Sequence, residues 1–206
     1  NIHDNAYAIG AIDFTGDMPI ILGPDGPSLG GFVCPAVIAH AELWKVGQLK
    51  PGDKVKFVPI TVEQAEALDA FVEDSLAGKS ATAPTTSETP KLEAIRHRIP
   101  ATDSRPEVVF RPASDRYLLV EFGPLVLDIA LRFWVHAVYL KLQAVQHPGI
   151  VDLTPGIRSL QIHIDGKHLK LANTEAMVAE LIESLNDVEH LEVPSRIVHL
   201  PLSWDD

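Results

Sequence analysis

The sequence is poor in sulfur: Cys34 is the only cysteine, and there are two methionines among 206 residues. A single cysteine excludes a disulfide within the chain, which suits a reducing compartment, and we expect a cytoplasmic protein. Apolar residues flank Cys34 on both sides. This setting favours a buried structural thiol over a nucleophile. No apolar run approaches the about 18 residues that a membrane span needs, so we expect no membrane partner.

Basic residues are also scarce. Lys and Arg number 17 against 28 Asp and Glu, and the net charge is −11. This balance argues against a nucleic-acid partner and is typical of a solvated acidic surface. The nine histidines include no HxH or HExxH pattern, so we expect no metal site. A G-x-S-x-G elbow is absent too, and spacing alone assembles no Ser-His-Asp triad.

The first 60 residues are rich in glycine and proline between short apolar runs. This composition predicts β-strands broken by turns, including a strand over Val55–Ile60 after a turn at Pro51–Asp53. From Val62 the apolar residues recur at helical spacing, and Gly78 is a suitable C-cap. The next residues, to about Arg105, contain little to bury and predict an exposed linker with a short helix around residues 92–96.

From Glu107 onward the pattern alternates between strands and helices. One or two strands are expected around a turn at residues 112–115, followed by a helix after Asp128 and two strands around Thr154–Gly156. A second helix capped by Asn173 and a strand over 195–204 complete the pattern. The order strand, helix, strand, strand, helix, strand is that of the ferredoxin-like α/β motif. The first helix is predicted to bury the face formed by Ile129, Phe133, Ala137, Leu140 and Ala144.

The stretch GPDGPSLGGF, residues 23–32, holds four glycines and two prolines. A phosphate-binding P-loop is excluded because Gly31 is followed by Phe32 and not by lysine, and a Rossmann fingerprint is excluded because the GxGxxG spacing is absent. Two interpretations stay open. The stretch is a turn between strands, or it is a backbone surface against a small planar amide or ureido ring. In the second case the ligand-facing residues would be Asp25, Gly26, Ser28, Gly30 and Gly31.

Two further stretches carry candidate site residues. NIHDNAY places His3, Asp4, Asn5 and Tyr7 just before a strand, either as turn-capping groups or as donors and acceptors that face a ligand. TPGIRSLQI places Arg158 and Ser159 between a turn and a buried strand. Arg158 could clamp a carboxylate of a ligand, or pair with a structural carboxylate such as Glu121 or Asp152.

Long segments of the chain resemble a known family. HDNAYAIGAIDFTGDMPIILGPDGPSLGGFVCPAVIAHAELWKVGQLKPGDKVKF resembles the end of the allophanate hydrolase subunit 2 family. RYLLVEFG, LDIALRFWVHAVYLKLQ, GIVDLTPGIRSLQIHID and VPSRIVHLPLSWDD resemble the start of the subunit 1 family. The two occur in this order in the carboxyltransferase region of the urea carboxylase family, which in some organisms is part of urea amidolyase.

The resemblance implies a mixed α and β fold. Residues 1–77 would be the C-terminal part of a cyclophilin-like β-barrel, 78–106 a linker, 107–194 the ferredoxin-like α/β domain (βαββαβ), and 195–206 the first strand of a second barrel. Both barrels would be incomplete, so the chain is expected to be a piece of a larger polypeptide and inactive by itself.

The resemblance also implies a reaction. The carboxyltransferase region would move a carboxyl group from N-carboxybiotin to urea and form allophanate. Biotin would arrive on a separate carrier domain, since no lysine flanked by methionines is present, while a biotin carboxylase domain would use ATP, Mg²⁺ and bicarbonate. The implied site comprises Asp4 and Asp25 as acid–base groups, with His3, Asn5, Tyr7, Gly26, Ser28, Gly30, Gly31, Arg158 and Ser159 binding urea or biotin. Two alternatives stay open: a component of a 5-oxoprolinase, and a non-enzymatic binding module that inhibits a kinase.

Overall fold

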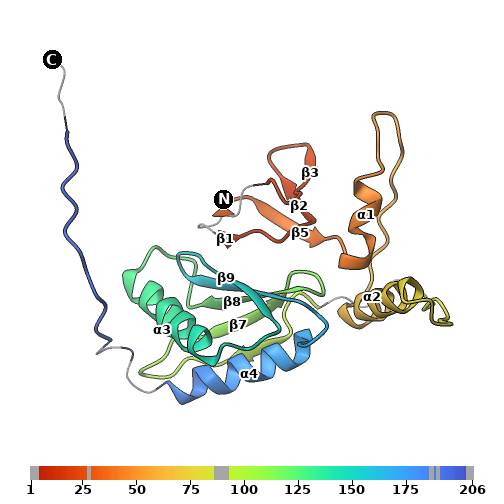
Figure 1. The fold of residues 1–206 in the computed structure, drawn as a ribbon. Helices are drawn as coiled ribbons and strands as arrows, with labels where there is room; N and C mark the ends of the chain where they lie inside the picture. The colour runs from red at the N-terminus through yellow and green to blue at the C-terminus, as the bar shows by residue number, and fades with distance from the viewer. Residues whose placement is uncertain (1–4, 27–28, 86–92, 186–187, 189–190, 203–206) are drawn as a thin grey trace.

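A five-stranded antiparallel sheet forms the centre of the molecule (Figure 1). The computed structural model describes residues 5–26, 29–85, 93–185, 188 and 191–202. The strand order is β6-β7-β8-β10-β9, and every neighbouring pair is antiparallel. The strands are β6 (His97–Ile99), β7 (Val108–Pro112), β8 (Tyr117–Phe122), β9 (Ile150–Pro155) and β10 (Ser159–Ile164).

Two long helices, α3 (Ile129–Val145) and α4 (Leu171–Ser184), pack on one face of this sheet (Figure 1). Side chains of a strand point alternately to its two faces. Six apolar residues of the two central strands therefore enter the core between sheet and helices and are fully buried there: Leu118, Val120, Phe122, Leu160, Ile162 and Ile164. Each such side chain stabilises the fold by about 1.5–3 kcal/mol. The opposite face carries the alternate residues and is free to build a site.

The mixed α and β fold is confirmed, whereas the ferredoxin-like motif stays a prediction. Strand β10 lies between β8 and β9 and is antiparallel to both, so β8, α3 and β9 form a split βαβ unit. The other neighbour of β8 is β7, which precedes it in the chain. The strand expected over residues 195–204 does not form: residues 195–202 carry no strand and run as extended chain away from the sheet, while 203 and 204 lie outside the described residues (Figure 1).

Helix α3 starts as predicted but buries a different face. Asp128 Oδ1 accepts a hydrogen bond from Ala130 N at 2.8 Å and so caps the helix. The predicted face is wrong, because Ile129 is 70% exposed and only Ala137 of that face is buried. The helix is apolar nearly all round, so periodicity did not fix its orientation. The stripe that meets the sheet is formed by Leu131, Val135, Val138 and Leu142.

Helix α4 begins earlier than the sequence suggested. Its N-cap is Lys170, which makes no side-chain capping bond, and the predicted cap Asn173 lies inside the helix and is exposed.

The N-terminal segment forms small sheets on the side of the central sheet away from α3 and α4 (Figure 1). A three-stranded sheet has the order β3-β2-β5, and β1 pairs with β4. The described strands do not close into a barrel, so a partial barrel stays a prediction. The elements are β1 (Asn5–Ala6), β2 (Ala11–Phe14), β3 (Pro19–Ile21), β4 (Leu29–Gly30), β5 (Val33–Val37), the 3₁₀ helix η1 (His40–Glu42) and α1 (Leu43–Val46).

The strand predicted over Val55–Ile60 is wrong for the chain as described. Those residues carry no strand, and Val55 and Phe57 are exposed. Among the described strands none pairs with these residues, and a strand needs such a partner.

The predicted helix over Val62–Gly78 is confirmed as α2 (Val62–Leu76). A reciprocal capping box between Thr61 and Gln64 starts it, and Gly78 follows the C-cap with a φ of +70°.

The connector is not structureless throughout. Strand β6 lies within the stretch predicted to be a linker and joins the edge of the central sheet. Residues 93–96 are not helical, and residue 92 lies outside the described part of the chain. Within that part, no helix is long and apolar enough to cross a membrane.

Candidate functional site

A cavity of about 470 Å³ lies between the N-terminal segment and the helix-free face of the central sheet. One wall comes from β1, β2 and β5, and the other from β7, β8 and β10. The polar residues of its lining include Asn5, Arg111, Glu121, Arg158, Ser159 and Gln161.

Strand alternation explains why the sheet wall is polar. In β10, Ser159 and Gln161 alternate with the buried core residues and point to the cavity face. In β8, Glu121 does the same and lies directly opposite Ser159 in the antiparallel register. On the β7 side, Arg111 is paired with Leu119. Two neighbouring cross-strand rows, one with Ser159 and Glu121 and the next with Gln161 and Arg111, therefore present a hydroxyl, an amide and charged groups to the same space.

Two hydrogen bonds join the walls. Ser159 Oγ donates to Asn5 Oδ1 at 2.9 Å, and Gln161 Nε2 donates to the Tyr7 carbonyl at 3.1 Å. Ser159 and Gln161 are both buried. Because Oδ1 of Asn5 is occupied by the serine hydroxyl, its amide nitrogen forms the other, donating end of the side chain.

The charged part of the wall is a carboxylate between two guanidinium groups. Arg111 Nε donates to Glu121 Oε2 at 2.5 Å, and Arg158 Nη2 donates to Oε1 at 2.7 Å. Arg158 Nη1 also donates to the Gly123 carbonyl at 3.2 Å. The structure therefore shows pairing with Glu121, one of the two roles left open for Arg158, and the clamping of a ligand carboxylate stays a prediction. The three side chains together still carry one net positive charge toward the cavity.

The glycine-rich stretch is shaped around Tyr7. A Cβ on Gly30 would lie 2.8 Å from Tyr7 Cε2, and Phe32 N donates to Tyr7 Oη at 2.7 Å. The missing side chain of Gly30 thus makes room for a tyrosine of the same chain. At the other end of the stretch, Gly26 N donates to the Gly23 carbonyl at 3.0 Å and closes a turn.

The sequence-predicted site residues divide into three groups. Asn5, Tyr7, Arg158 and Ser159 line one cavity, although 154 residues separate Asn5 from Ser159. Gly30 borders Tyr7, and the next residue, Gly31, is half-buried. Asp25 is exposed and Gly26 is half-buried at the turn, and both lie outside the cavity lining. His3, Asp4 and Ser28 lie outside the described residues. The acid–base roles of Asp4 and Asp25 stay predictions.

Cys34 lies in the N-terminal wall of the cavity, half-buried. Burial, with a smaller contribution from the charge of Asp13, raises the pKa of this thiol to about 11. The raised pKa keeps the thiol protonated at neutral pH, which agrees with a structural role. Among the described residues, no group of three or more His, Cys, Asp or Glu could hold a metal ion.

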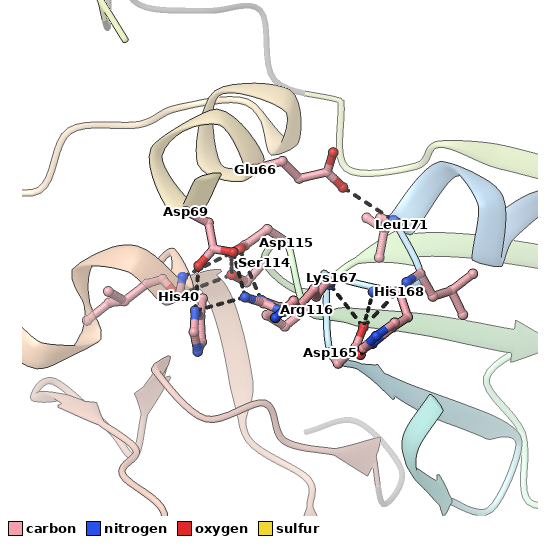
Figure 2. Close-up of polar contacts among 12 residues, drawn as sticks. His40, Glu66, Asp69, Ser114, Asp115, Arg116, Asp165, Lys167, His168 and Leu171 are labelled. Atoms are coloured by element: carbon pink, nitrogen blue, oxygen red, sulfur yellow. Dashed lines mark hydrogen bonds and ion pairs between the residues drawn. The ribbon is translucent and has the colours of Figure 1, made fainter. Parts of the chain in front are cut away.

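A second polar cluster lies beside the cavity and was missed by sequence reasoning. Figure 2 shows His40, Asp69 and Arg116 pointing toward one another from three separate segments. Arg116 Nη2 donates to Asp69 Oδ2 at 2.6 Å, and Asp69 Oδ1 lies 2.7 Å from His40 Nδ1. The residues are 29 and 47 positions apart in the sequence, so no local pattern relates them.

Arg111, Glu121 and Gln161 of the cavity were not proposed as site residues either. A signal for two of them exists in the sequence: YLLVEF and SLQIHI place a polar residue at alternate positions of otherwise apolar strands.

Both walls of the cavity lie in segments that match known protein families. Residues 1–59 match the family model described as carboxyltransferase domain, subdomain A and B, and residues 108–206 match the one described as carboxyltransferase domain, subdomain C and D. A urea amidolyase of Lachancea kluyveri is 39% identical over 213 residues, covering 100% of this chain and 12% of the relative.

Two solved structures are similar as well. The crystal structure of the Kluyveromyces lactis urea amidolyase superposes with a TM-score of 0.81 at 38% identity, covering 91% of this chain and 12% of that one. The Kluyveromyces lactis urea carboxylase gives 0.81 at 36% identity, over 91% of this chain and 17% of that one. The chain thus spans a small fraction of the length of its relatives.

Proposed function

The chain belongs to the carboxyltransferase domain family of urea amidolyases and urea carboxylases, and from this premise we propose that it is part of the carboxyltransferase of a biotin-dependent urea carboxylase. Urea and N-carboxybiotin would be the substrates and allophanate the product. The biotin would be carried on another domain of the same polypeptide, and ATP and Mg²⁺ would be used by a biotin carboxylase domain. Within this proposal, residues 1–77 are the end of one barrel domain and 195–206 the start of another.

One observation carries the proposal: the polar cavity lies between two segments that match successive subdomains of a carboxyltransferase. Ligand sites of multi-part enzymes are commonly formed where two such units meet. The cavity volume of about 470 Å³ falls in the range of small-molecule sites.

The residues of the cavity fit a flat ureido group that carries a carboxylate. Urea and a ureido ring present N–H donors and a carbonyl acceptor, and a carboxylated ring adds a negative charge. The Asn5 amide can donate to a carbonyl, while the net positive charge of Arg111, Glu121 and Arg158 attracts a carboxylate. The buried apolar side chain of Leu119 makes part of the cavity wall unfavourable to water.

The chemistry supplied by the carried group would be a carboxyl that leaves a ureido nitrogen and bonds to a urea nitrogen. The urea nitrogen gives up one proton, which the vacated ureido nitrogen takes up, directly or by way of a carboxylate of the chain. The chain would contribute positioning and charge. Arg111, which is less buried than Arg158, is suited to face a carboxylate directly. Ser159 would hold Asn5 in orientation through its hydroxyl. Asp4 and Asp25 remain the proposed acceptors of the urea proton, because a positioned carboxylate can accept one.

The test uses the full-length enzyme that contains this chain. The measured quantities are incorporation of labelled bicarbonate into allophanate and ATP hydrolysis stimulated by urea or by 5-oxoproline. Arg111→Met and Asn5→Ala should lower transfer to urea by about tenfold or more, the loss of one or two hydrogen bonds to a reacting group. Carboxylation of biotin without urea should be unchanged.

Arg98→Met is the matched control. Arg98 belongs to the edge strand β6, forms an exposed ion pair with Glu107 and does not line the cavity. Stimulation by 5-oxoproline alone would contradict the proposal and favour the 5-oxoprolinase alternative. Unchanged carboxyl transfer in both cavity variants, together with binding to a histidine kinase, would favour the binding module.

A further inference from the structure

Three segments that are distant in the sequence are tied together by Arg116 (Figure 2). Arg116 precedes β8, Asp69 belongs to α2, and His40 begins η1. Besides its 2.6 Å bond to Asp69, Arg116 Nη2 lies 3.2 Å from His40 Nδ1, and Arg116 Nε lies 3.6 Å from Asp115 Oδ2. Arg116 thus links η1, α2 and the central sheet.

The charged side chains of the cluster are largely buried, so the charge of each side chain strongly affects its neighbours. The side chains of Arg116 and Asp69 are 9% and 11% exposed, and that of Asp115 is 1% exposed. Burial alone would raise the pKa of Asp69, but His40 and Arg116 outweigh it and hold that pKa below its usual value. Removing the guanidinium would leave two buried carboxylates without their cation, which strongly disfavours the closed arrangement.

The same turn that carries Arg116 also lines the cavity. Ser114 is part of the cavity wall, and its hydroxyl lies 3.2 Å from the Ile38 carbonyl and 2.6 Å from Asp115 Oδ1. Asp115 Oδ1 in turn accepts from His40 N at 3.0 Å. The end of the N-terminal wall, just after β5, is therefore fastened to the β7–β8 turn through groups that Arg116 holds in place.

We propose that Arg116 is a positioning residue for the cavity: by joining Asp69, Asp115 and His40, it keeps the N-terminal wall seated on the sheet without touching a ligand. The importance for carboxyl transfer rests on the proposed function, whereas the seating of the wall does not. Gly166 belongs to the same arrangement. Its φ is +64°, and a Cβ there would lie 2.5 Å from Arg116 Cζ. Any side chain at residue 166 would therefore collide with the guanidinium in its observed position.

Cys34 offers a readout of wall seating that is independent of activity. It is the only cysteine of the chain, lies in the N-terminal wall and is half-buried. In the full-length enzyme, the rate of its alkylation by iodoacetamide is followed by mass spectrometry of the peptide that contains Cys34. Arg116→Met should raise this rate about tenfold or more, because the wall opens locally more often. Gly166→Ala should raise it too, although every charged group is kept.

General destabilisation is separated from loss of seating by a second variant. Leu142→Ala removes a core side chain of α3 on the far face of the sheet and should lower thermal stability without loosening the wall. Alkylation is compared at temperatures equally far below each variant's Tm. If Leu142→Ala accelerates alkylation as much as Arg116→Met does, Arg116 only stabilises the fold and the proposal is wrong.

Kinetics complete the test. Arg116→Met should raise KM for urea and lower kcat, and Arg116→Lys should restore part of both, since a lysine keeps the charge but lacks the second donor branch. Faster alkylation with normal kinetics would refute a positioning role in catalysis. A wild-type enzyme without urea-dependent transfer would refute the proposed function alone, because the alkylation comparison would still decide whether Arg116 seats the wall.

Discussion

Arg158 and Glu121 form an ion pair inside the cavity wall, with Arg158 Nη2 2.7 Å from Glu121 Oε1 and neither side chain more than 15% exposed. Arg158→Met should leave Glu121 with Arg111 as its single partner and weaken the wall by about 1–3 kcal/mol, the usual consequence of removing one partner of a partly buried charged pair. Hydrogen exchange of β8 and β10 in the full-length enzyme measures this loss.

The control for this prediction is again Arg98→Met, since both partners of the Arg98–Glu107 pair are close to half exposed. Exposed pairs contribute little, so its effect should stay within about 0.5 kcal/mol. Equal effects of the two substitutions would mean that the Arg158–Glu121 pair is not part of a protected wall.

The close approach of Gly30 to Tyr7 gives a second prediction. A Cβ at residue 30 would press against the Tyr7 ring and disturb the 2.7 Å bond from Phe32 N to Tyr7 Oη. Gly30→Ala should therefore cost about 1–3 kcal/mol, as overpacking does. In a Tyr7→Ala background the same glycine substitution should cost much less, because the ring is absent. Additive costs in the double variant, measured by hydrogen exchange of residues 5–14, would disprove the contact.

Local patterns predicted four of the five strands of the central sheet, all except β6. The strands around residues 112–115 and 154–156, the cap at Asp128 and the buried alternation of β10 all follow from nearest neighbours in the sequence. The buried face of α3 could not be predicted in this way, because apolar residues surround the helix and the sheet alone decides which stripe faces inward. Nor could β6 be recognised, since a short edge strand depends on its partner β7.

The candidate site was predictable to about the same degree. Asn5, Tyr7, Arg158 and Ser159 were singled out because they lie next to predicted strands, and the structure brings them to one cavity, although their role in a site stays a prediction. Their partners were harder to find. Gln161 bonds to a carbonyl 154 positions away, and Arg116 reaches Asp69 across 47 positions. Such contacts follow from tertiary packing and cannot be predicted from the spacing of nearby residues.

The thiol of Cys34 should react slowly at neutral pH. Its pKa is raised to about 11, first by burial and then by the charge of Asp13, and the thiolate is the reactive form. The alkylation rate of the native wild-type enzyme should therefore increase about tenfold for each pH unit up to about pH 10. Asp13→Asn should shift this profile to lower pH. A profile that levels off near pH 8.5 would show an ordinary, solvated thiol.

Asp165 gives a prediction about acid stability. Burial alone would raise its pKa, but the His168 ring and the backbone N–H groups of residues 167–169 outweigh burial and hold the pKa well below the usual 3.8. Because the folded-state pKa is depressed, the stabilisation is complete above the unfolded-state pKa near 3.8 and is lost as pH falls below it. The Asp165 carboxylate, through these hydrogen bonds, holds together the loop that leads from β10 into α4.

Asp165→Asn should therefore lower Tm clearly at pH 7, and the difference from wild type should shrink as the pH is reduced from 4 toward 2. Thermal unfolding of the two full-length proteins at pH 7, 5, 4 and 3 measures the difference. Asp74→Asn is the control, since Asp74 forms an exposed ion pair with Lys79, and such a pair contributes little to stability. A difference for Asp165→Asn that is constant from pH 7 to pH 3, or grows in acid, would mean that the carboxylate charge does not stabilise this loop.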